Sequence, residues 1–260
     1  MWGILLTFVG TFGDEALDTI GKRQILCKAQ SIYTTAFLHY LGGIIFFGAI
    51  ALVSHQTFVF SMESLPTFAA RAFLEIIQCH VTLLALAQAD RSTFSFVRTG
   101  TIPILLLLDI LLGYALSPTQ ILGAVLIAAT LSLFFYDGRF SKAGLGLVIF
   151  STFNAVATIS LYKYNISNFN SVVAEQLITL LILFFYFYIF SYCKCKRNPL
   201  WELRKPLFAT QSLLAGIGSV AQSFAFQFAP AAVIIAAKRS SAVLTSANTG
   251  KGNFKENNYP

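Results

Sequence analysis

Polar and ionisable side chains recur at helical spacing inside two strongly apolar segments of the sequence. Within each stripe the residues follow at intervals of four, three and four, which places them on one face of a helix. The first stripe consists of Thr7, Thr11, Asp14 and Asp18, and the second consists of Arg71, Glu75, Gln78 and Thr82. Because a charge inside a membrane costs several kcal/mol unless it faces protein or water, both stripes are candidate linings of a solute path.

The acidic members of these stripes are candidates for coupling transport to a proton or another cation. A carboxyl group shielded from water can bind and release a proton in alternation with a solute, which suits Asp14, Asp18 and Glu75. An alternative for the two aspartates is that the first span ends near Gly13 and leaves them at the membrane interface. The alternative for Glu75 is a pair with Arg71, one turn earlier on the same helix.

Two basic residues in other apolar segments are candidates for binding the solute. Arg98 and Asp109 lie three helical turns apart, about 16 Å along a helix, so they are too distant to pair directly. Lys238, with the hydroxyl of Ser241 one turn later, and Arg98 would suit an anionic or zwitterionic solute. The alternatives for these cations are snorkelling, or pairing with Asp109 or Glu175. The candidate binding or coupling residues are therefore Asp14, Asp18, Glu75, Gln78, Arg98, Asp109, Lys238 and Ser241.

The sequence lacks the patterns of common catalytic and metal sites. It contains no nucleophile elbow, no phosphate-binding loop and no pair of histidines at metal-ligand spacing. We therefore expect no catalytic residue, no metal and no cofactor, and we predict that the protein is not an enzyme.

The elements that must position these residues are membrane-spanning helices. The 260 residues are 56% apolar and only 11% charged, whereas soluble domains carry about a quarter of their residues as charges. Apolar runs long enough to cross about 30 Å of hydrocarbon recur along the chain without a two-residue alternation, which predicts an all-α bundle. The nine predicted spans are residues 2–20, 32–53, 66–89, 95–116, 119–135, 143–161, 172–192, 206–228 and 231–246.

The distribution of basic residues predicts an orientation in the membrane. The connections after the first, third, fifth and seventh spans hold eleven Lys and Arg, whereas the other connections hold only Lys163. The positive-inside rule therefore predicts that the N-terminus lies outside a multi-pass protein, most simply in the plasma membrane. The net charge of +7 forms no basic domain with stacking positions, so we expect no nucleic-acid partner.

A weak internal repeat divides the chain. One constant shift, without gaps, superposes 66–104 on 206–244, with Pro66 on Pro206 and Arg98 on Lys238. We predict two five-helix units over residues 1–137 and 143–246, the second reduced to four helices, followed by a polar tail over 247–260. Because five is odd, the second copy would enter the membrane the other way up, as an inverted repeat.

At two places the sequence resembles the drug/metabolite transporter superfamily, in particular proteins with paired EamA domains. The matching segments are ALAQADRSTFSFVRTGTIPILLLLDILLGYALSPTQILGAVLIAATL (85–131) and AFQFAPAAVIIAAKRSSAVL (225–244). The resemblance implies a ten-helix carrier with a central cavity between its halves, which moves small solutes by alternating access. In this family a proline breaks the fourth helix, which here is Pro103.

Two departures from the family pattern leave a second interpretation open. The end TSANTGKGNFKENNYP is too polar to form the tenth helix, which makes a truncated or frameshifted carrier the second interpretation. The family also usually keeps both termini inside. The sequence therefore predicts a secondary transporter of small metabolites or drug-like solutes that is embedded in the lipid bilayer. Transport would be coupled to protons or would exchange one solute for another. The alternative is an inactive or fragmentary carrier that acts only as a membrane interaction protein, for which a homodimer is the candidate assembly.

Overall fold

The computed structural model describes residues 2–26, 31–53, 58–111, 113, 117–136, 142–196 and 198–249. Within these ranges the regular structure is helical throughout, so the predicted all-α class is confirmed. The α-helices are α1 (Trp2–Leu26), α2 (Ile32–Val53), α3 (Leu65–Gln88), α4 (Arg91–Arg98), α5 (Thr101–Leu111), α6 (Pro118–Tyr136), α7 (Leu145–Asn168), α8 (Val172–Cys195), α9 (Pro206–Phe228) and α10 (Ala231–Thr249). Two short 3-10 helices, η2 (Met62–Ser64) and η3 (Pro199–Arg204), precede α3 and α9.

Five helical segments of the described chain are long and apolar enough to cross a membrane. They are Tyr33–Val53, Met62–Gln88, Thr93–Leu111, Leu145–Asn168 and Val172–Lys194. The other four predicted spans correspond to α1, α6, α9 and α10, which do not reach the same length and hydropathy over their described residues. The composition of these five helices identifies a membrane protein.

The fourth predicted span is divided in two, and the division is not at Pro103. Helix α4 ends at Arg98 and α5 begins at Thr101, so the break lies at Thr99 and Gly100. Pro103 has no N–H to donate to the carbonyl of Thr99, which instead accepts from Ile102 at 3.0 Å. The proline itself fits the first turn of α5, where an N–H would have no partner within the helix.

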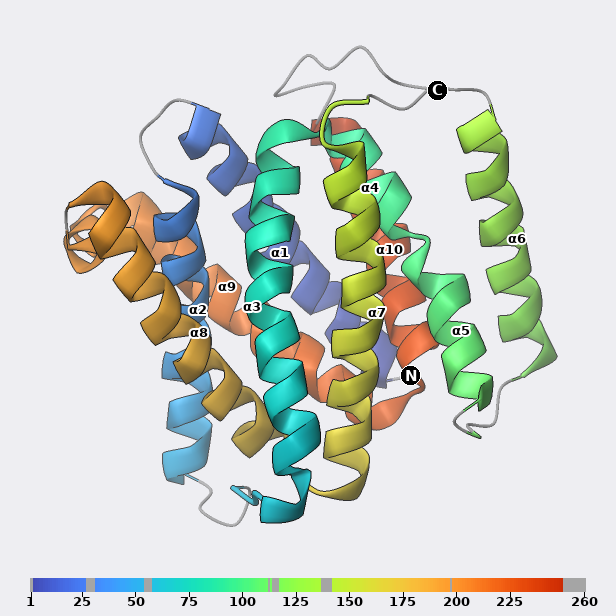
Figure 1. Ribbon diagram of the computed structural model, residues 1–260, viewed down its shortest axis with the longest axis horizontal. Coiled ribbons are helices and arrows are strands. Elements are labelled where there is room, and N and C mark those ends of the chain that lie inside the picture. Colours follow the sequence, from blue (N-terminus) through green and yellow to red (C-terminus); the bar gives the residue numbers. More distant parts are fainter. Residues whose placement is uncertain are drawn as a thin grey trace.

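The helices form one bundle in which segments distant in sequence lie side by side (Figure 1). Helix α1 runs along α9, α2 packs on α8 and α9, and α3 packs on α7. Helix α10 lies against α1, α4 and α5, near the middle of the bundle, whereas α6 stands at one edge with α5 as its main neighbour (Figure 1).

Three pairs of elements begin at a constant separation along the chain. Helices α2 and α8 begin at Ile32 and Val172, α4 and α10 begin at Arg91 and Ala231, and the first turns of α3 and α9 contain Pro66 and Pro206. Each separation equals the shift that places Pro66 on Pro206 in the sequence repeat. In both halves a 3-10 helix leads into the proline-initiated helix.

Close packing of α1 on α9 depends on glycine. A Cβ atom on Gly13 would lie 2.8 Å from the carbonyl oxygen of Leu214, and one on Gly10 would lie 3.0 Å from that of Gly218. Because backbone atoms cannot swing aside as a flexible side chain does, a larger residue here would force the two helices apart.

We expect Gly13→Leu to lower stability by about 1–3 kcal/mol, because the added side chain meets the backbone of α9. The measurement is thermal unfolding of the purified protein in detergent. Gly48→Leu is the matched control, since a Cβ on Gly48 would have no atom within 4 Å. Equal melting temperatures for the two variants would contradict this account of the α1–α9 contact.

Candidate functional site

A cavity of about 330 Å³ lies inside the bundle. Its described lining comes from eight helices, α1 to α4 and α7 to α10, so it lies where the two halves of the chain meet. Cavities of about 300–1,000 Å³ are typical of small-molecule sites. The charged and polar lining residues include Asp14, Arg71, Glu75, Gln78, Arg98, Tyr162, Gln176, Gln222, Lys238 and Arg239, and the apolar ones include Leu83, Leu180, Leu183 and Phe226.

The structure brings together five of the eight residues selected from the sequence. Asp14, Glu75, Gln78, Arg98 and Lys238 all line the cavity although they come from four different helices. The side chains of the two selected residues Asp18 and Ser241 lie outside the described part of the chain.

Asp109 has a different position from the one expected. It is absent from the described lining, and its Oδ2 atom accepts a hydrogen bond of 3.0 Å from the backbone N–H of Ala232. Ala232 lies in the first turn of α10, where backbone N–H groups have no partner within the helix. Asp109 therefore joins α5 to the start of α10, and its contact is structural.

Lys238 is held by groups from two other helices. Its Nζ atom donates to Asp14 Oδ2 at 2.6 Å and to Gln222 Oε1 at 2.5 Å, which ties α10 to α1 and α9. The side chains of Lys238 and Asp14 are each 19% exposed, so the pair is only partly withdrawn from the cavity. Among the described contacts, Lys238 thus pairs with Asp14, and not with Asp109 or Glu175, the partners considered from the sequence.

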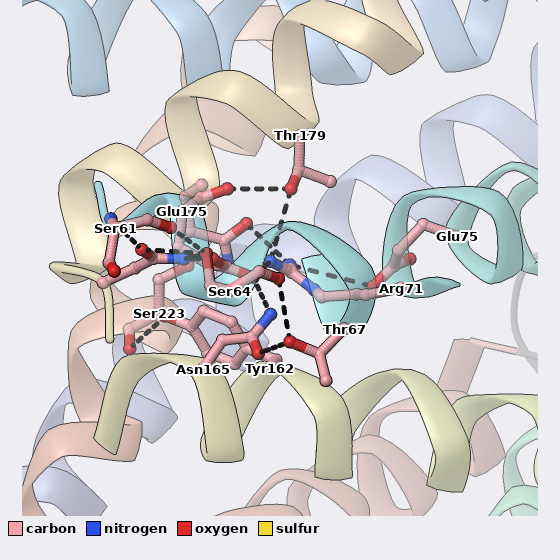
Figure 2. A network of polar contacts seen from close by, with 12 residues as sticks. Ser61, Ser64, Thr67, Arg71, Glu75, Tyr162, Asn165, Glu175, Thr179 and Ser223 are labelled. Atoms are coloured by element: carbon pink, nitrogen blue, oxygen red, sulfur yellow. Dashed lines mark hydrogen bonds and ion pairs between the residues drawn. The ribbon is translucent and has the colours of Figure 1, made fainter. Parts of the chain in front are cut away.

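Arg71 lies at the centre of a second, more deeply buried network (Figure 2). Its Nη1 atom donates to Glu175 Oε1 at 2.8 Å and to Thr179 Oγ1 at 3.3 Å. The guanidinium carbon lies 4.5 Å from the centre of the Tyr162 ring, a cation–π distance. The expected pair with Glu75 is present but longer, at 3.9 Å, so Glu175 is the main partner of Arg71.

The carboxylate of Glu175 is fully buried and has three partners. Oε1 accepts from Arg71 and, at 2.9 Å, from Asn165 Nδ2, while Oε2 accepts from Asn170 Nδ2 at 2.5 Å. Thr67 in turn donates to Asn165 Oδ1 at 2.7 Å (Figure 2). Because each charge is paired and hydrogen-bonded, this pair can persist away from water.

The same network fixes the segment that leads into α3. Asn170 Oδ1 accepts from the backbone N–H of Ser61 at 2.9 Å, and its Nδ2 donates to Ser64 Oγ at 2.9 Å. Two hydrogen bonds also join Val59 and Ser171, one between backbone groups and one through the serine hydroxyl. The start of α3, the end of α7 and the start of α8 are therefore tied together at one end of the cavity.

Gln78 connects the cavity wall to α7. Its Nε2 atom donates to Ser151 Oγ and Thr82 Oγ1, both at 2.9 Å, and its Oε1 atom accepts from Asn154 Nδ2 at 2.8 Å. Both ends of the amide are thus used within the protein, so Gln78 shapes the cavity by holding α3 to α7.

The residues selected from the sequence for binding or coupling omit several lining residues. Arg71 belongs to a stripe that is a candidate lining, Gln222 is the repeat-related position of Thr82, and Arg239 follows Lys238, so a signal for these three exists in the sequence. Tyr162 and Gln176 carry no such signal, because the role of a tyrosine or glutamine on an apolar helix depends on which helix packs beside it.

Comparison with known families finds no family model that matches this chain, and comparison with curated proteins finds no relative. The similarity to the drug/metabolite transporter superfamily therefore remains a prediction from the two sequence segments.

The cavity combines ionic groups of both signs with apolar surface. Its described lining contains the basic residues Arg71, Arg98, Lys238 and Arg239 and the acidic residues Asp14 and Glu75. Among the residues that the structure describes, no group of three or more His, Cys, Asp or Glu could hold a metal ion. The chemistry available is ionic binding and proton exchange at carboxylates.

We expect Glu175→Ala to destabilise the protein by about 3–5 kcal/mol, because it leaves the buried guanidinium of Arg71 without its main partner. Glu202→Ala is the control, since Glu202 pairs at 2.7 Å with Lys205, whose side chain is 58% exposed, and such pairs contribute about 0–1 kcal/mol. Chemical denaturation in detergent measures both. A Glu175→Ala variant as stable as Glu202→Ala would contradict the structural role of the pair.

Proposed function

We propose that the protein is a multi-pass secondary transporter of the plasma membrane that moves small solutes by alternating access. The observation that carries the proposal is the cavity of about 330 Å³ with charged side chains contributed by both halves of an apolar helix bundle. Ionisable residues in apolar helices are costly, and in membrane proteins they mark solute paths and proton relays.

The spacing of the helices supports the proposal that the bundle is an inverted repeat. Three pairs of elements begin at one constant separation, and the same shift aligns the sequence with itself. A unit of five spans, with α4 and α5 together forming one, reverses the direction of the second copy. In transporters of this architecture the solute binds between the repeats, near the middle of the membrane.

The lining suggests a solute that carries an anionic group on a partly apolar body. Lys238 and Arg98 supply cations, while Leu83, Leu180 and Phe226 supply apolar surface. Lys238 donates to Asp14, so a carboxylate or phosphate would compete with Asp14 for the same ammonium group.

This competition provides a mechanism that couples binding of the solute to uptake of a proton. A solute anion that displaces Asp14 leaves its carboxylate without a partner, and taking up a proton would neutralise it. Glu75, whose side chain is 25% exposed beside the cavity, is a second site for a transported proton. Exchange of one anion for another requires no proton and uses the same Lys238.

We expect Lys238→Ala to reduce transport at least tenfold, because a charge-assisted hydrogen bond contributes about 1.5–3 kcal/mol and each 1.4 kcal/mol is a factor of about ten. The measurement is initial uptake into proteoliposomes with a panel of radiolabelled carboxylates, amino acids and sugar phosphates. Asp14→Asn, Asp18→Asn and Glu75→Gln should abolish or shift the pH dependence of that uptake.

Lys205→Ala is the matched control for Lys238→Ala, because it removes an exposed lysine that is not part of the described lining. Wild-type uptake and pH dependence in all four variants would exclude the proposed roles. A wild-type protein that transports no member of the panel, with or without a pH gradient, would count against transport itself.

A further inference from the structure

Helices α2 and α9 touch at backbone distance. A Cβ on Gly42 would lie 1.7 Å from the carbonyl oxygen of Ser212, and one on Gly216 would lie 2.6 Å from that of Gly42. Farther along the same contact Phe47 stacks on Phe224, with ring centres 6.3 Å apart. At Gly42 and Gly216 the two helices therefore leave no room for solute or water between them.

The pair of helices that the repeat relates to α2 and α9 is packed differently. The shift of the sequence repeat carries α2 onto α8 and relates α9 to α3, so Gly42 corresponds to Ile182 and Gly216 corresponds to Ile76. Helices α3 and α8 make few backbone contacts, and Ile182 is 36% exposed. Isoleucines therefore occupy the two positions that correspond to these glycines.

Long side chains, and not the backbones, bridge α3 and α8. Near the start of α8, Arg71 donates hydrogen bonds to Glu175 and Gln176 (Figure 2 shows Arg71 and Glu175). About three turns later on α8, the hydroxyl of Tyr186 lies 2.8 Å from Nε2 of His80. The buried Arg71–Glu175 pair fixes α3 to the start of α8, so a change in the separation of the two helices must occur beyond it, toward His80 and Tyr186.

The cavity lining also differs between α3 and its repeat-related helix α9. Arg71, Glu75 and Gln78 of α3 line the cavity. Their repeat-related positions on α9 are Gln211, Ala215 and Gly218, which are buried and absent from the described lining. The cavity therefore extends along α3, and α1 and α2 cover the corresponding surface of α9.

We propose that the α2–α9 and α3–α8 contacts are the two gates of the cavity and that only one of them is closed at a time. The α2–α9 gate is the closed one in this structure. In the alternate conformation α3 closes on α8 while α2 separates from α9. The inference rests on the proposed transport function, because two inverted copies of one unit can each adopt the conformation of the other and so expose the cavity alternately.

Gly42→Ala tests this exchange without any solute. Its Cβ meets the backbone of Ser212, so α2 and α9 must separate by about 2 Å to reach ordinary van der Waals contact. Distances are measured by pulsed electron spin resonance in nanodiscs, with the native cysteines replaced by serine. One pair of spin labels, at Ile45 and Leu213, spans α2 and α9, and the other, at Phe73 and Phe185, spans α3 and α8; all four positions are exposed.

We expect Gly42→Ala to lengthen the α2–α9 distance and to shorten the α3–α8 distance. Gly48→Ala is the control on the same helix and should change neither, because a Cβ there meets nothing within 4 Å. An α3–α8 distance that stays constant or lengthens, or an α2–α9 distance that does not change, would overturn the proposal.

If Gly42→Ala does not fold, Gly216→Ala makes the same test from α9, since its Cβ would lie 2.6 Å from the carbonyl oxygen of Gly42. Failure of the transport function is distinguishable from failure of this inference, because uptake and label distances are measured separately.

Discussion

The carboxylate of Glu175 is the constraint on which one side of the cavity depends. A charge this deeply buried is tolerated only where the protein itself supplies the partners that water would supply. Arg71 from α3, Asn165 from α7 and Asn170 from the turn before α8 do so. The two oxygen atoms of this carboxylate thereby hold together three helices and the segment that leads into α3. The same contacts fix the orientation of Arg71 at the cavity wall.

Two ion pairs at the cavity, Arg71–Glu175 and Asp14–Lys238, join the first half of the chain to the second. Arg71 and Asp14 belong to the first predicted unit, whereas their partners Glu175 and Lys238 belong to the second. The two pairs differ in exposure, because Glu175 is fully buried while Asp14 and Lys238 are each 19% exposed. The buried pair therefore suits a structural link, and the accessible pair suits exchange with a solute.

The helices can be predicted from the sequence because apolar runs and polar connections alternate clearly. The predicted spans 32–53 and 206–228 coincide with α2 and α9. The span predicted over 143–161 extends to Asn168 in α7, because Asn165, which resembles a loop residue, finds Glu175 and Thr67 as partners inside the bundle.

The site can be predicted only in part, because helical periodicity identifies a face and not the helix that covers it. Asp14 and Lys238 are both candidates from the sequence, but their pairing joins two ends of the chain that no local pattern relates. Asp109 is a candidate by the same reasoning and instead accepts a hydrogen bond at the start of α10. An ionisable residue on an apolar helix thus indicates a polar partner, and only the tertiary structure shows whether that partner belongs to the cavity.

The most direct test of the account is whether the cavity is reached by water from both sides of the membrane. Ser219→Cys, on the cavity wall, is treated in sealed vesicles with a membrane-impermeant thiol reagent, in a background without native cysteines. Leu122→Cys, on the exposed surface of α6, reports labelling outside the cavity. The account predicts that Ser219→Cys reacts from either side, whereas reaction from one side only, or from neither, would contradict it.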